Sequence, residues 1–421
     1  MISRQQSAKD FQADSRRLIA DSQLMDLHTD FRRYLCPTSA EPLGLTIERA
    51  EGCFLYGPER RSILDFVSGI AVSSVGHGCP EVLRAIAAQV ERHLHVMVYG
   101  EMVQEAQVAL AKRLAEIAPG DLSMTFFCNS GAEAIEGALK LCRKATGRPR
   151  VVAFAGGYHG DTLGALSISG EPRYQKPFEP LLPEVHLLPF DGLESLRAID
   201  ERVAAVVVEP IQGEAGIRVP GPDFLPTLSA RCREAGALLV LDEVQTGIGR
   251  TGRWFASEHW SVIPDCLVVA KAVGGGMPLG AFIARPELMH TLASDPPFAH
   301  VTTFGGHPVS CAAGLAALRF IEQQGLLKNA ETMGSYLRNA ISALAGVKEV
   351  RGLGLLLGVV LEEPSLTRAV LRLALERDLL LGDFLNAEGV IRVAPPLVVS
   401  RELCDRAVEI LAESLKVARK R

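Results

Sequence analysis

A lysine and an aspartate each follow an apolar run of this sequence, where a charged side chain is unfavourable to bury. Lys271 comes after "CLVVA" and shortly before three glycines, and Asp242 ends "ALLVLD". Burial lowers the pKa of a lysine and makes its amine a nucleophile toward an aldehyde, whereas a buried aspartate needs a cationic partner. Each residue alone has an ordinary alternative: an interior lysine paired with a carboxylate, or a turn aspartate.

The spacing of these two residues suggests that they act together. Lys271 follows Asp242 by 29 residues, enough for a strand, a helix and a second strand that bring both side chains to one edge of a sheet. An amine for an aldehyde and a carboxylate for a protonated ring nitrogen are the pair that pyridoxal phosphate requires. The pair therefore indicates a site for this cofactor.

A phosphate-binding turn is expected in "NSGAEAIEGALKL" at residues 129–141. Ser130 and Glu133 fit a capping box, so a helix should begin there, and the free amides of Gly131 and Ala132 would point at an anion. The simpler alternative is a capping box that only starts a helix.

An aromatic ring is placed between glycines in "GGYHGDTLG" at residues 156–164. The glycines allow the chain to approach a ligand closely, and the ring of Tyr158 could stack on a flat heteroaromatic ring. A packed turn tyrosine, and a core histidine at His159, are the alternatives.

The elements that must position these residues follow two patterns. Between about residues 80 and 310, continuous apolar runs alternate with helical stretches, which predicts a parallel sheet covered by helices on both faces. Ligands bind at the carboxyl ends of such strands, where the candidate residues fall. The runs are "MTFFC", "RVVAFAG", "VAAVVVEP", "ALLVLDE" and "CLVVAKA".

The rest of the chain predicts a second domain. Residues 1 to about 30 are expected to form a polar or amphipathic helical arm, and helices mixed with strand-like segments after about residue 320 predict an α+β domain. We therefore expect an N-terminal arm and part of the small domain at 1–75, a large cofactor-binding domain at 76–315, and the C-terminal small domain at 316–421.

Composition argues against several classes of protein. The formal net charge is -5 without a long block of like charge, which disfavours nucleic acid or a membrane surface as a partner and favours small molecules. Nine cysteines without a CxxC pair indicate neither a metal site nor a disulfide framework. The start lacks the apolar segment of a secretory signal and no run is long enough to span a bilayer, so a cytoplasmic location is expected.

Six segments taken together resemble the class III pyridoxal-phosphate aminotransferases. They are "NSGAEAIEGALKL", "GGYHGDTLG", "VVVEPIQGEAG", "LVLDEVQTGIGRTG", "LVVAKAVGGGMPLGA" and "TTFGGHPVSCAAG", and the likeness covers about residues 30–415 in the family order. The resemblance implies fold type I of the pyridoxal-phosphate enzymes: an α/β fold with a mostly parallel seven-stranded sheet sandwiched by helices, plus a smaller α+β domain.

The resemblance also implies roles at the cofactor. Lys271 would form the internal aldimine and later move a proton, and Asp242 would keep the pyridine nitrogen protonated. Gly131 and Ala132 match amides that bind the phosphate. The remaining matched positions are Ser130 beside those amides, Tyr158 as the stacking aromatic with His159 next to it, Val244 on the other ring face, and Gln245 as the partner of the phenolic oxygen.

Thr303 matches a threonine that reaches the phosphate of the neighbouring subunit in this family. The match implies a homodimer with shared active sites. A threonine on a half-buried strand is the simpler alternative.

Four residues bear on the substrates through the same resemblance. Glu214 and Arg392 match a switch in which the arginine binds the α-carboxylate of a keto acid and the glutamate otherwise neutralises it; a structural salt bridge is the alternative. Asp161 stands where ornithine and acetylornithine aminotransferases carry an arginine, and it would repel a carboxylate. Ile70 replaces a tyrosine of the ornithine enzyme, and "RYQKPFEPLLPEVHLLPF" is similar to putrescine aminotransferases.

We therefore expect an aminotransferase that moves a terminal (ω) amino group from a diamine or other ω-amine, such as putrescine or cadaverine, to 2-oxoglutarate or pyruvate by a ping-pong mechanism. The alternatives are an ornithine- or acetylornithine-type or specialised-metabolite aminotransferase, and a pyridoxal-phosphate decarboxylase or aminomutase on the same scaffold. A binding protein with a decayed site is a further alternative, against which the intact Lys271 and Asp242 argue.

Overall fold

The computed structural model describes residues 27–420, and the chain falls into two compact units, residues 1–47 and 48–421. In the first unit, α2 (Leu27–Tyr34) is a short amphipathic helix, and most of the arm expected over residues 1–30 lies outside the described residues. The second unit contains every candidate site residue. Within residues 27–420, no helix is both long and apolar enough to cross a membrane.

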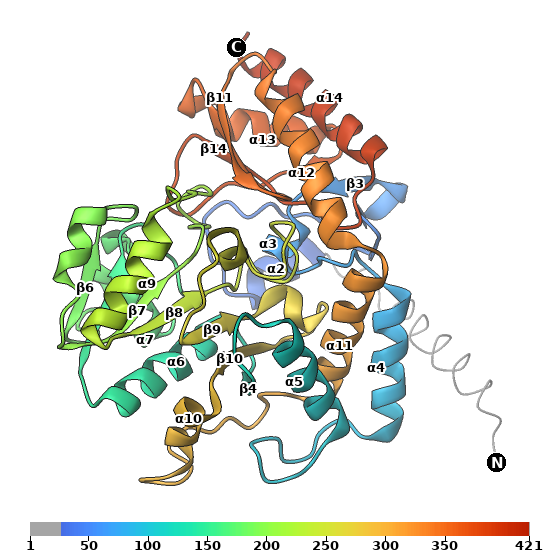
Figure 1. Cartoon of the computed structure of the whole chain (residues 1–421). Helices are drawn as coiled ribbons and strands as arrows, with labels where there is room; N and C mark the ends of the chain where they lie inside the picture. The colour runs from blue at the N-terminus through green and yellow to red at the C-terminus, as the bar shows by residue number, and fades with distance from the viewer. Residues whose placement is uncertain (1–26, 421) are drawn as a thin grey trace, which may run out of the picture. The chain divides into compact units, whose positions relative to one another are not determined.

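A seven-stranded sheet runs through the second unit (Figure 1). Its strands, in order across the sheet, are β4 (Met124–Cys128), β10 (Gly280–Ala284), β9 (Cys266–Val269), β8 (Leu238–Asp242), β7 (Val203–Val208), β5 (Arg150–Phe154) and β6 (Val185–Leu188). All neighbours are parallel except that β10 is antiparallel to both β4 and β9. The mostly parallel sheet is therefore confirmed.

Two strands of this sheet, β6 and β10, have no counterpart among the five apolar runs, and the antiparallel one of the two is β10. It begins at Gly280, only a short stretch after β9 ends at Val269. A parallel neighbour would need a crossover connection of a dozen or more residues. Because the connection between β9 and β10 is shorter than that, β10 runs antiparallel to β9.

Both faces of the sheet are buried, which explains why its strands are continuously apolar. On β7, Val206 and Val208 pack into one hydrophobic cluster, whereas Ala205 and Val207 pack into another. Alternate side chains of a strand point to opposite faces, so the two clusters lie on the two sides of the sheet. The helices around it are α4 (Pro80–Arg92), α5 (Glu105–Ile117), α6 (Gly131–Thr146), α7 (Leu163–Ile168), α8 (Pro172–Gln175), α9 (Phe224–Ala235), α10 (Pro286–Met289) and α11 (Pro308–Gln323).

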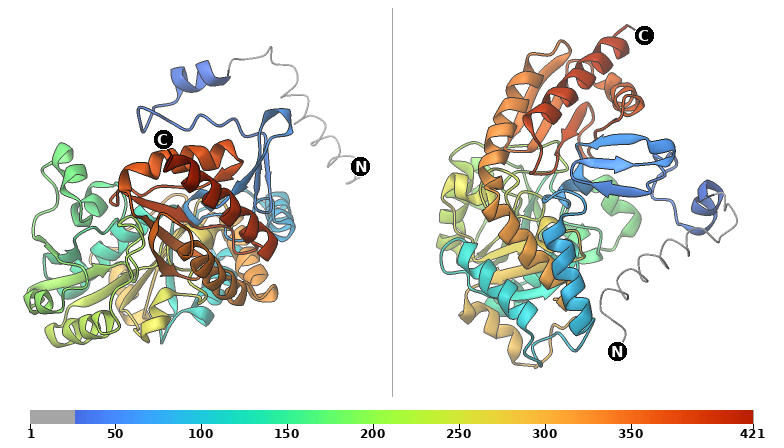
Figure 2. Two further views of the ribbon diagram at one scale, coloured as in Figure 1. Left: turned by 90° about the horizontal axis from the view of Figure 1, so that it is seen from above. Right: turned by 90° about the vertical axis from the view of Figure 1, so that its right-hand side faces the viewer.

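The smaller sheets combine both ends of the second unit. An antiparallel sheet contains β11 (Val347–Leu353), β12 (Leu356–Leu361) and β14 (Val390–Val393), and the helices α12 (Leu326–Ser342), α13 (Thr367–Glu376) and α14 (Arg401–Ala418) belong to the same part of the chain. A second sheet has the order β1 (Arg49–Glu51), β2 (Phe54–Tyr56), β3 (Ser62–Asp65) and β13 (Leu379–Leu380). Figure 2 shows these blue N-terminal strands beside the orange and red C-terminal elements. The boundaries 1–75, 76–315 and 316–421 stay predictions.

Arg250 joins three distant parts of the chain. Its fully buried guanidinium donates to the Ser74 hydroxyl at 2.8 Å and to the carbonyls of Leu355 and Pro395. Burial lowers the pKa of this guanidinium to about 10, against the opposing charge of Asp65. One side chain thereby satisfies acceptors from the N-terminal segment and the C-terminal domain, and holds both against the loop that follows β8.

Candidate active site

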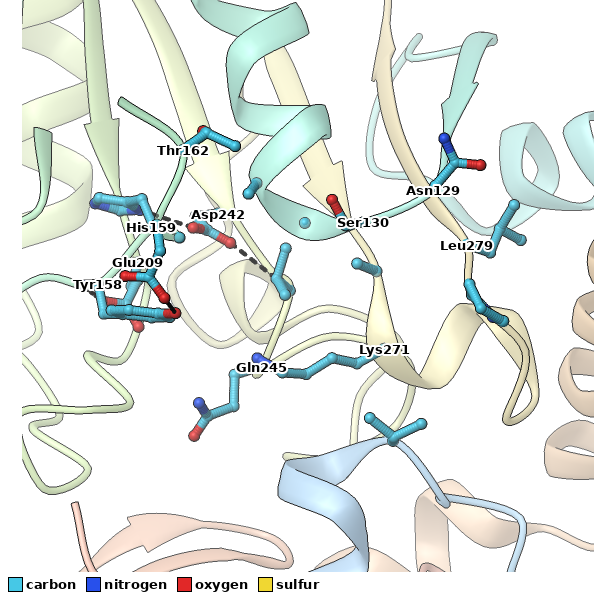
Figure 3. Close-up of a pocket in the computed structure, with 18 of the residues that line it drawn as sticks. Asn129, Ser130, Tyr158, His159, Thr162, Glu209, Asp242, Gln245, Lys271 and Leu279 are labelled. Carbon is cyan, nitrogen blue, oxygen red and sulfur yellow. Dashed lines mark hydrogen bonds and ion pairs between the residues drawn. The ribbon is translucent and has the colours of Figure 1, made fainter. Parts of the chain in front are cut away.

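The carboxyl ends of the strands surround a cavity of about 700 Å³ (Figure 3). This is the edge at which open α/β sheets bind ligands. The lining residues are Val72, Asn129, Ser130, Gly131, Ala132, Tyr158, His159, Gly160, Asp161, Thr162, Glu209, Asp242, Val244, Gln245, Ala270, Lys271, Gly276, Met277, Pro278 and Leu279. All sequence-predicted site residues belong to this set except Ile70, Glu214, Thr303 and Arg392.

Lys271 is the first residue of the 3₁₀ helix η5 (Lys271–Gly274) and has an unusual backbone conformation. Its φ of 50° lies in the left-handed region, which costs a non-glycine residue on the order of 1–3 kcal/mol and persists where the surroundings impose it. Burial lowers the pKa of the amine, although the charge of Asp242 opposes the shift. Within residues 27–420 the amine has no bonded partner, and it extends into the cavity (Figure 3).

Asp242 is held by a buried histidine and a backbone amide. Its Oδ2 lies 2.7 Å from His159 Nδ1, and its Oδ1 accepts a hydrogen bond from the Val244 amide at 3.0 Å. Burial alone would lower the pKa of His159, but the hydrogen bond to Asp242 and the charge of Asp242 outweigh it and raise the pKa. The histidine therefore serves to orient the carboxylate that faces the cavity.

Glu209 is a site residue to which the sequence analysis gave no role. It follows β7 directly, as Asp242 ends β8, so the same pattern of a carboxylate after a buried strand could have found it. Its oxygens accept hydrogen bonds from the amides of Tyr158 at 3.0 Å and Gly213 at 2.8 Å. Burial raises its pKa to about 7, with Asp242 adding to the shift and His159 opposing it.

The helix N-terminus that is predicted to bind the phosphate forms at the start of α6. Ser130 is the N-cap, and its hydroxyl accepts from the Glu133 amide at 3.2 Å. The Glu133 carboxylate accepts a hydrogen bond from the backbone amide of Asn129 at 2.6 Å. In a standard capping box it would accept from the N-cap amide, one residue later. A Cβ on Gly160 would lie 2.6 Å from Ala132 Cβ, so only glycine lets the tyrosine loop approach this helix end.

Tyr158 and Asp161 form a polar pair on the cavity wall. The Tyr158 hydroxyl donates to Asp161 Oδ2 at 2.8 Å, and burial together with this contact raises the pKa of the phenol. Among the lining residues of the described chain, Lys271 carries the one amine or guanidinium charge. The wall that holds Asp161 is therefore acidic and offers no partner for a second carboxylate.

Glu214 and Arg392 form a buried ion pair directly behind the cavity. Arg392 Nη2 lies 2.7 and 2.8 Å from the two oxygens of Glu214, and Arg392 Nη1 donates to Gln245 Oε1 at 3.0 Å. Gln245, which lines the cavity, also donates to Glu214 at 3.3 Å. Burial alone would raise the pKa of Glu214, but Arg392 outweighs it and lowers the pKa. This contact gives Gln245 a partner other than the phenolic oxygen expected from the resemblance.

Two predicted residues lie outside the cavity of their own chain. Thr303 is exposed, and its carbonyl accepts a hydrogen bond from His95 at 2.9 Å. Ile70 is 43% exposed in α3 (Ser68–Ala71), whose backbone turns left-handed, and Val72 lines the cavity instead. The position of Ile70 depends on this local turn, which apolar patterning does not reveal.

These strand-end charges, the helix N-terminus and the buried switch pair are the parts that the family resemblance requires. The sequence profile of the family "Aminotransferase class-III" matches residues 35–415. The chain therefore belongs to the class III aminotransferases.

Relatives with curated functions and solved structures extend the match. An acetylornithine aminotransferase from Methanopyrus kandleri is 43% identical over 378 residues, covering 89% of this chain and 95% of that protein. A putrescine aminotransferase from Pectobacterium atrosepticum is 38% identical over 413 residues, covering 92% and 87%. The solved ornithine aminotransferase of Toxoplasma gondii, with PLP at partial occupancy in its active site, has a TM-score of 0.87 at 30% identity and covers 94% of both chains.

Pyridoxal phosphate is the cofactor of this family, and the residues of the cavity fit it. The α6 N-terminus with Ser130 would hold the phosphate, and Asp242, whose oxygens each accept one hydrogen bond, keeps lone pairs for a ring nitrogen. Tyr158 and Val244 line the same cavity as the unpartnered amine of Lys271.

The lowered pKa of Glu214 and the raised pKa of Glu209 predict opposite pH dependences of stability. A lowered folded-state pKa gives stability that is present above the unfolded pKa of about 4.3 and is lost as the pH falls through the folded value. We therefore expect Glu214→Gln to be less stable than wild type by roughly 3–5 kcal/mol near pH 7, and this difference to shrink only as the pH falls below about 4.3, the unfolded pKa.

Glu209→Gln provides the comparison of opposite sign. Because the pKa of Glu209 is raised to about 7, its folded protonated form is favoured, and wild type should lose stability relative to Glu209→Gln between about pH 5 and 7. Thermal unfolding of wild type and both variants from about pH 2 to 8 covers both windows and measures the two slopes. Slopes of the same sign would contradict the charge assignments.

Proposed function

We propose that this aminotransferase moves the amino group of a terminal (ω) amine to 2-oxoglutarate or pyruvate in a ping-pong cycle. The observation that carries the proposal is one cavity in which the free amine of Lys271 lies with the held carboxylate of Asp242, in front of the buried Glu214–Arg392 pair. Lys271 and Asp242 would take part in the amino-transfer chemistry, and the Glu214–Arg392 pair would bind the carboxylate of the keto-acid acceptor.

The residues of the chain divide the work of proton transfer and binding. Pyridoxal phosphate, when bound, supplies the electron-withdrawing ring that stabilises negative charge on the substrate carbon. Burial lowers the pKa of Lys271, which favours the neutral amine that can take up a proton and return it. His159 and the Val244 amide keep the Asp242 carboxylate oriented, so that its charge faces the cavity.

The acceptor would bind through Arg392. Its guanidinium is preoriented by Gln245 and lies over the Phe384 ring, with 4.2 Å from Cζ to the ring centroid. A keto-acid carboxylate offers the same bidentate geometry as the Glu214 carboxylate, so the two can exchange without leaving a buried charge unpaired. A donor without a carboxylate near Arg392 leaves the internal pair closed.

The donor that the geometry favours is a diamine or other ω-amine without a carboxylate at its far end, such as putrescine or cadaverine. Asp161 supports this choice, because its carboxylate lies on the wall where an amino-acid donor would need a cation. A protonated far amine would instead be attracted to that wall.

An acetylornithine-type donor is the second candidate, and the names of the relatives favour it over a diamine. The Methanopyrus relative is more similar to this chain than the putrescine relative. Both candidates present a terminal primary amine to the same site, so the cofactor chemistry is shared. All these relatives are aminotransferases, which favours amino transfer over the decarboxylase and aminomutase alternatives.

We also propose the homodimer with shared active sites. Thr303 lies exposed and outside its own cavity, so it is available to the cavity of a second copy. Large apolar side chains are exposed in its surroundings and in the 94–103 segment, as expected of an interface. Examples are Met97, Val103, Phe298 and Phe304. The cytoplasmic location stays a prediction.

Lys271→Ala should abolish amino transfer, because the cavity lining formed by residues 27–420 contains no second lysine that could take its place. We expect at least a 10³-fold loss of kcat, in the range reported for removal of a covalent catalytic group. The exposed Lys112→Ala variant is the matched control and should retain wild-type turnover. Wild-type rates in Lys271→Ala, measured with a coupled amino-transfer assay, would refute the mechanism.

Asp161 should decide between the two donor classes. In an amine panel with 2-oxoglutarate and with pyruvate, wild type should prefer putrescine or cadaverine to N-acetylornithine. Asp161→Arg should shift the ratio of kcat/KM toward N-acetylornithine by at least tenfold, the worth of one charged hydrogen bond of about 1.5–3 kcal/mol. Asp161→Asn is the neutral control. A wild-type preference for N-acetylornithine would instead establish the second candidate.

The shared site predicts complementation between chains. Light scattering should give about twice the chain mass of 45.3 kDa. Thr303→Ala should weaken cofactor binding about tenfold, as expected for a lost hydrogen bond to a charged group. When it is mixed with Lys271→Ala, one site per heterodimer is intact and tight binding should return to half of the sites. A monomeric mass, or unchanged cofactor affinity in Thr303→Ala, would contradict the shared site.

A further inference from the structure

A second cavity of about 370 Å³ lies away from the active site and is lined by three arginines. Arg351 comes from β11, Arg338 from α12, and Arg218 from the loop that follows β7. The other lining residues are Val219, Glu349, Val350, Gly352 and Leu353, none of which lines the active-site cavity. We call this cavity the arginine pocket.

The positive charge of the three guanidinium groups is only partly compensated. Within residues 27–420 none of them forms an ion pair, and Glu349 is the one acidic residue among the lining residues of the pocket. Burial lowers the pKa of Arg351; the charge of Glu349 opposes that shift and the charge of Arg218 adds to it. Like charges that converge without a partner repel one another, and a bound anion would remove this repulsion.

Most of the N–H donors in the arginine pocket also have no acceptor in the described part of the chain. Arg338 donates once, to the Gly352 carbonyl at 3.5 Å, and Arg351 donates to the carbonyls of Gly216 at 2.6 Å and Ala215 at 3.5 Å. The Arg218 guanidinium lies 5.4 Å from the Phe190 ring centroid. Each guanidinium has five N–H donors in a planar fork that suits phosphate and carboxylate oxygens.

The arginine pocket adjoins the turn that carries the switch glutamate. Gln212 and Arg218 are joined by a pair of backbone hydrogen bonds, and Glu214 lies in the turn between them. Gly216 has a φ of 82°, and a Cβ there would lie 2.7 Å from the Arg351 guanidinium, so this arginine packs directly on the turn. A ligand that binds the guanidinium of Arg218 or Arg351 would therefore change the contacts that hold the turn containing Glu214.

We propose that the arginine pocket binds a small multivalent oxyanion, a phosphate or a polycarboxylate, and that its occupancy loosens the turn that holds Glu214 against Arg392. The proposed anion binding is inferred from the three arginines alone. The coupling rests on the proposed function, because it concerns the arginine that would receive the keto acid.

The binding is tested by calorimetric titration of the cofactor-loaded enzyme, whose own phosphate site is filled. Inorganic phosphate and citrate are titrated separately at constant ionic strength, and the tighter ligand identifies the chemistry. We expect one saturable site per chain, weakened at least tenfold in Arg218→Gln and in Arg338→Gln. Arg368→Gln removes an exposed arginine of α13 outside the pocket and should bind as wild type does. Absence of saturable binding in wild type, or equal binding in all three variants, would overturn the site.

The coupling has a separate readout. The tighter of the two anions should lower the KM of the keto acid at least twofold in wild type without changing kcat, and should have no effect in Arg218→Gln. A raised or unchanged KM would overturn the coupling while leaving the binding result intact. If the enzyme lacks amino-transfer activity altogether, the proposed function fails and the calorimetric result still decides the site.

Discussion

The hydrogen bond between His159 and Asp242 is the interaction on which the rest of the site depends. A carboxylate at the end of a buried strand loses its hydration, and without polar partners it would be unstable by several kcal/mol or would take up a proton. His159 and one backbone amide supply those partners at the outer side of the carboxylate. The inner side keeps its negative charge toward the cavity, where it offsets part of the cost of burying the Lys271 ammonium.

The turn after β8 connects the cofactor end of the cavity with the acceptor end. Asp242 and Gln245 are three residues apart, yet one faces the cofactor chemistry and the other bonds both members of the Glu214–Arg392 pair. The buried Glu243 between them accepts hydrogen bonds from the amides of residues 256 and 257, which fixes the turn. Under the proposed function, a change in this turn would therefore disturb both half-reactions, whereas a change at Asp161 would affect the amine donor.

The features that sequence predicts here are those with a local cause. Continuous apolar runs indicate the buried sheet, and Ser130 indicates the helix N-terminus, because each depends on neighbours along the chain. Glu209 obeys the same strand-end pattern as Asp242 and could have been found by applying it to every run. The arginine pocket could not have been found, because Arg218 is 120 residues before Arg338 in the chain and only tertiary packing brings it to Arg338 and Arg351. The role proposed for Thr303 involves a second chain, which no pattern within one chain describes.

The pairing of β3 with β13 has a consequence for the order in which the protein is made. Leu64 aligns with Leu379, so the sheet that contains the N-terminal strands lacks its edge strand β13 until the ribosome has added more than 300 residues after β3. At about 5–20 residues per second this takes roughly 15–60 seconds. The strands of the large sheet are all synthesised within this interval, so the cofactor-binding domain can assemble while Ser62–Asp65 still waits for its partner. During synthesis, the edge of β3 therefore stays open to pairing with other strands until β13 is made.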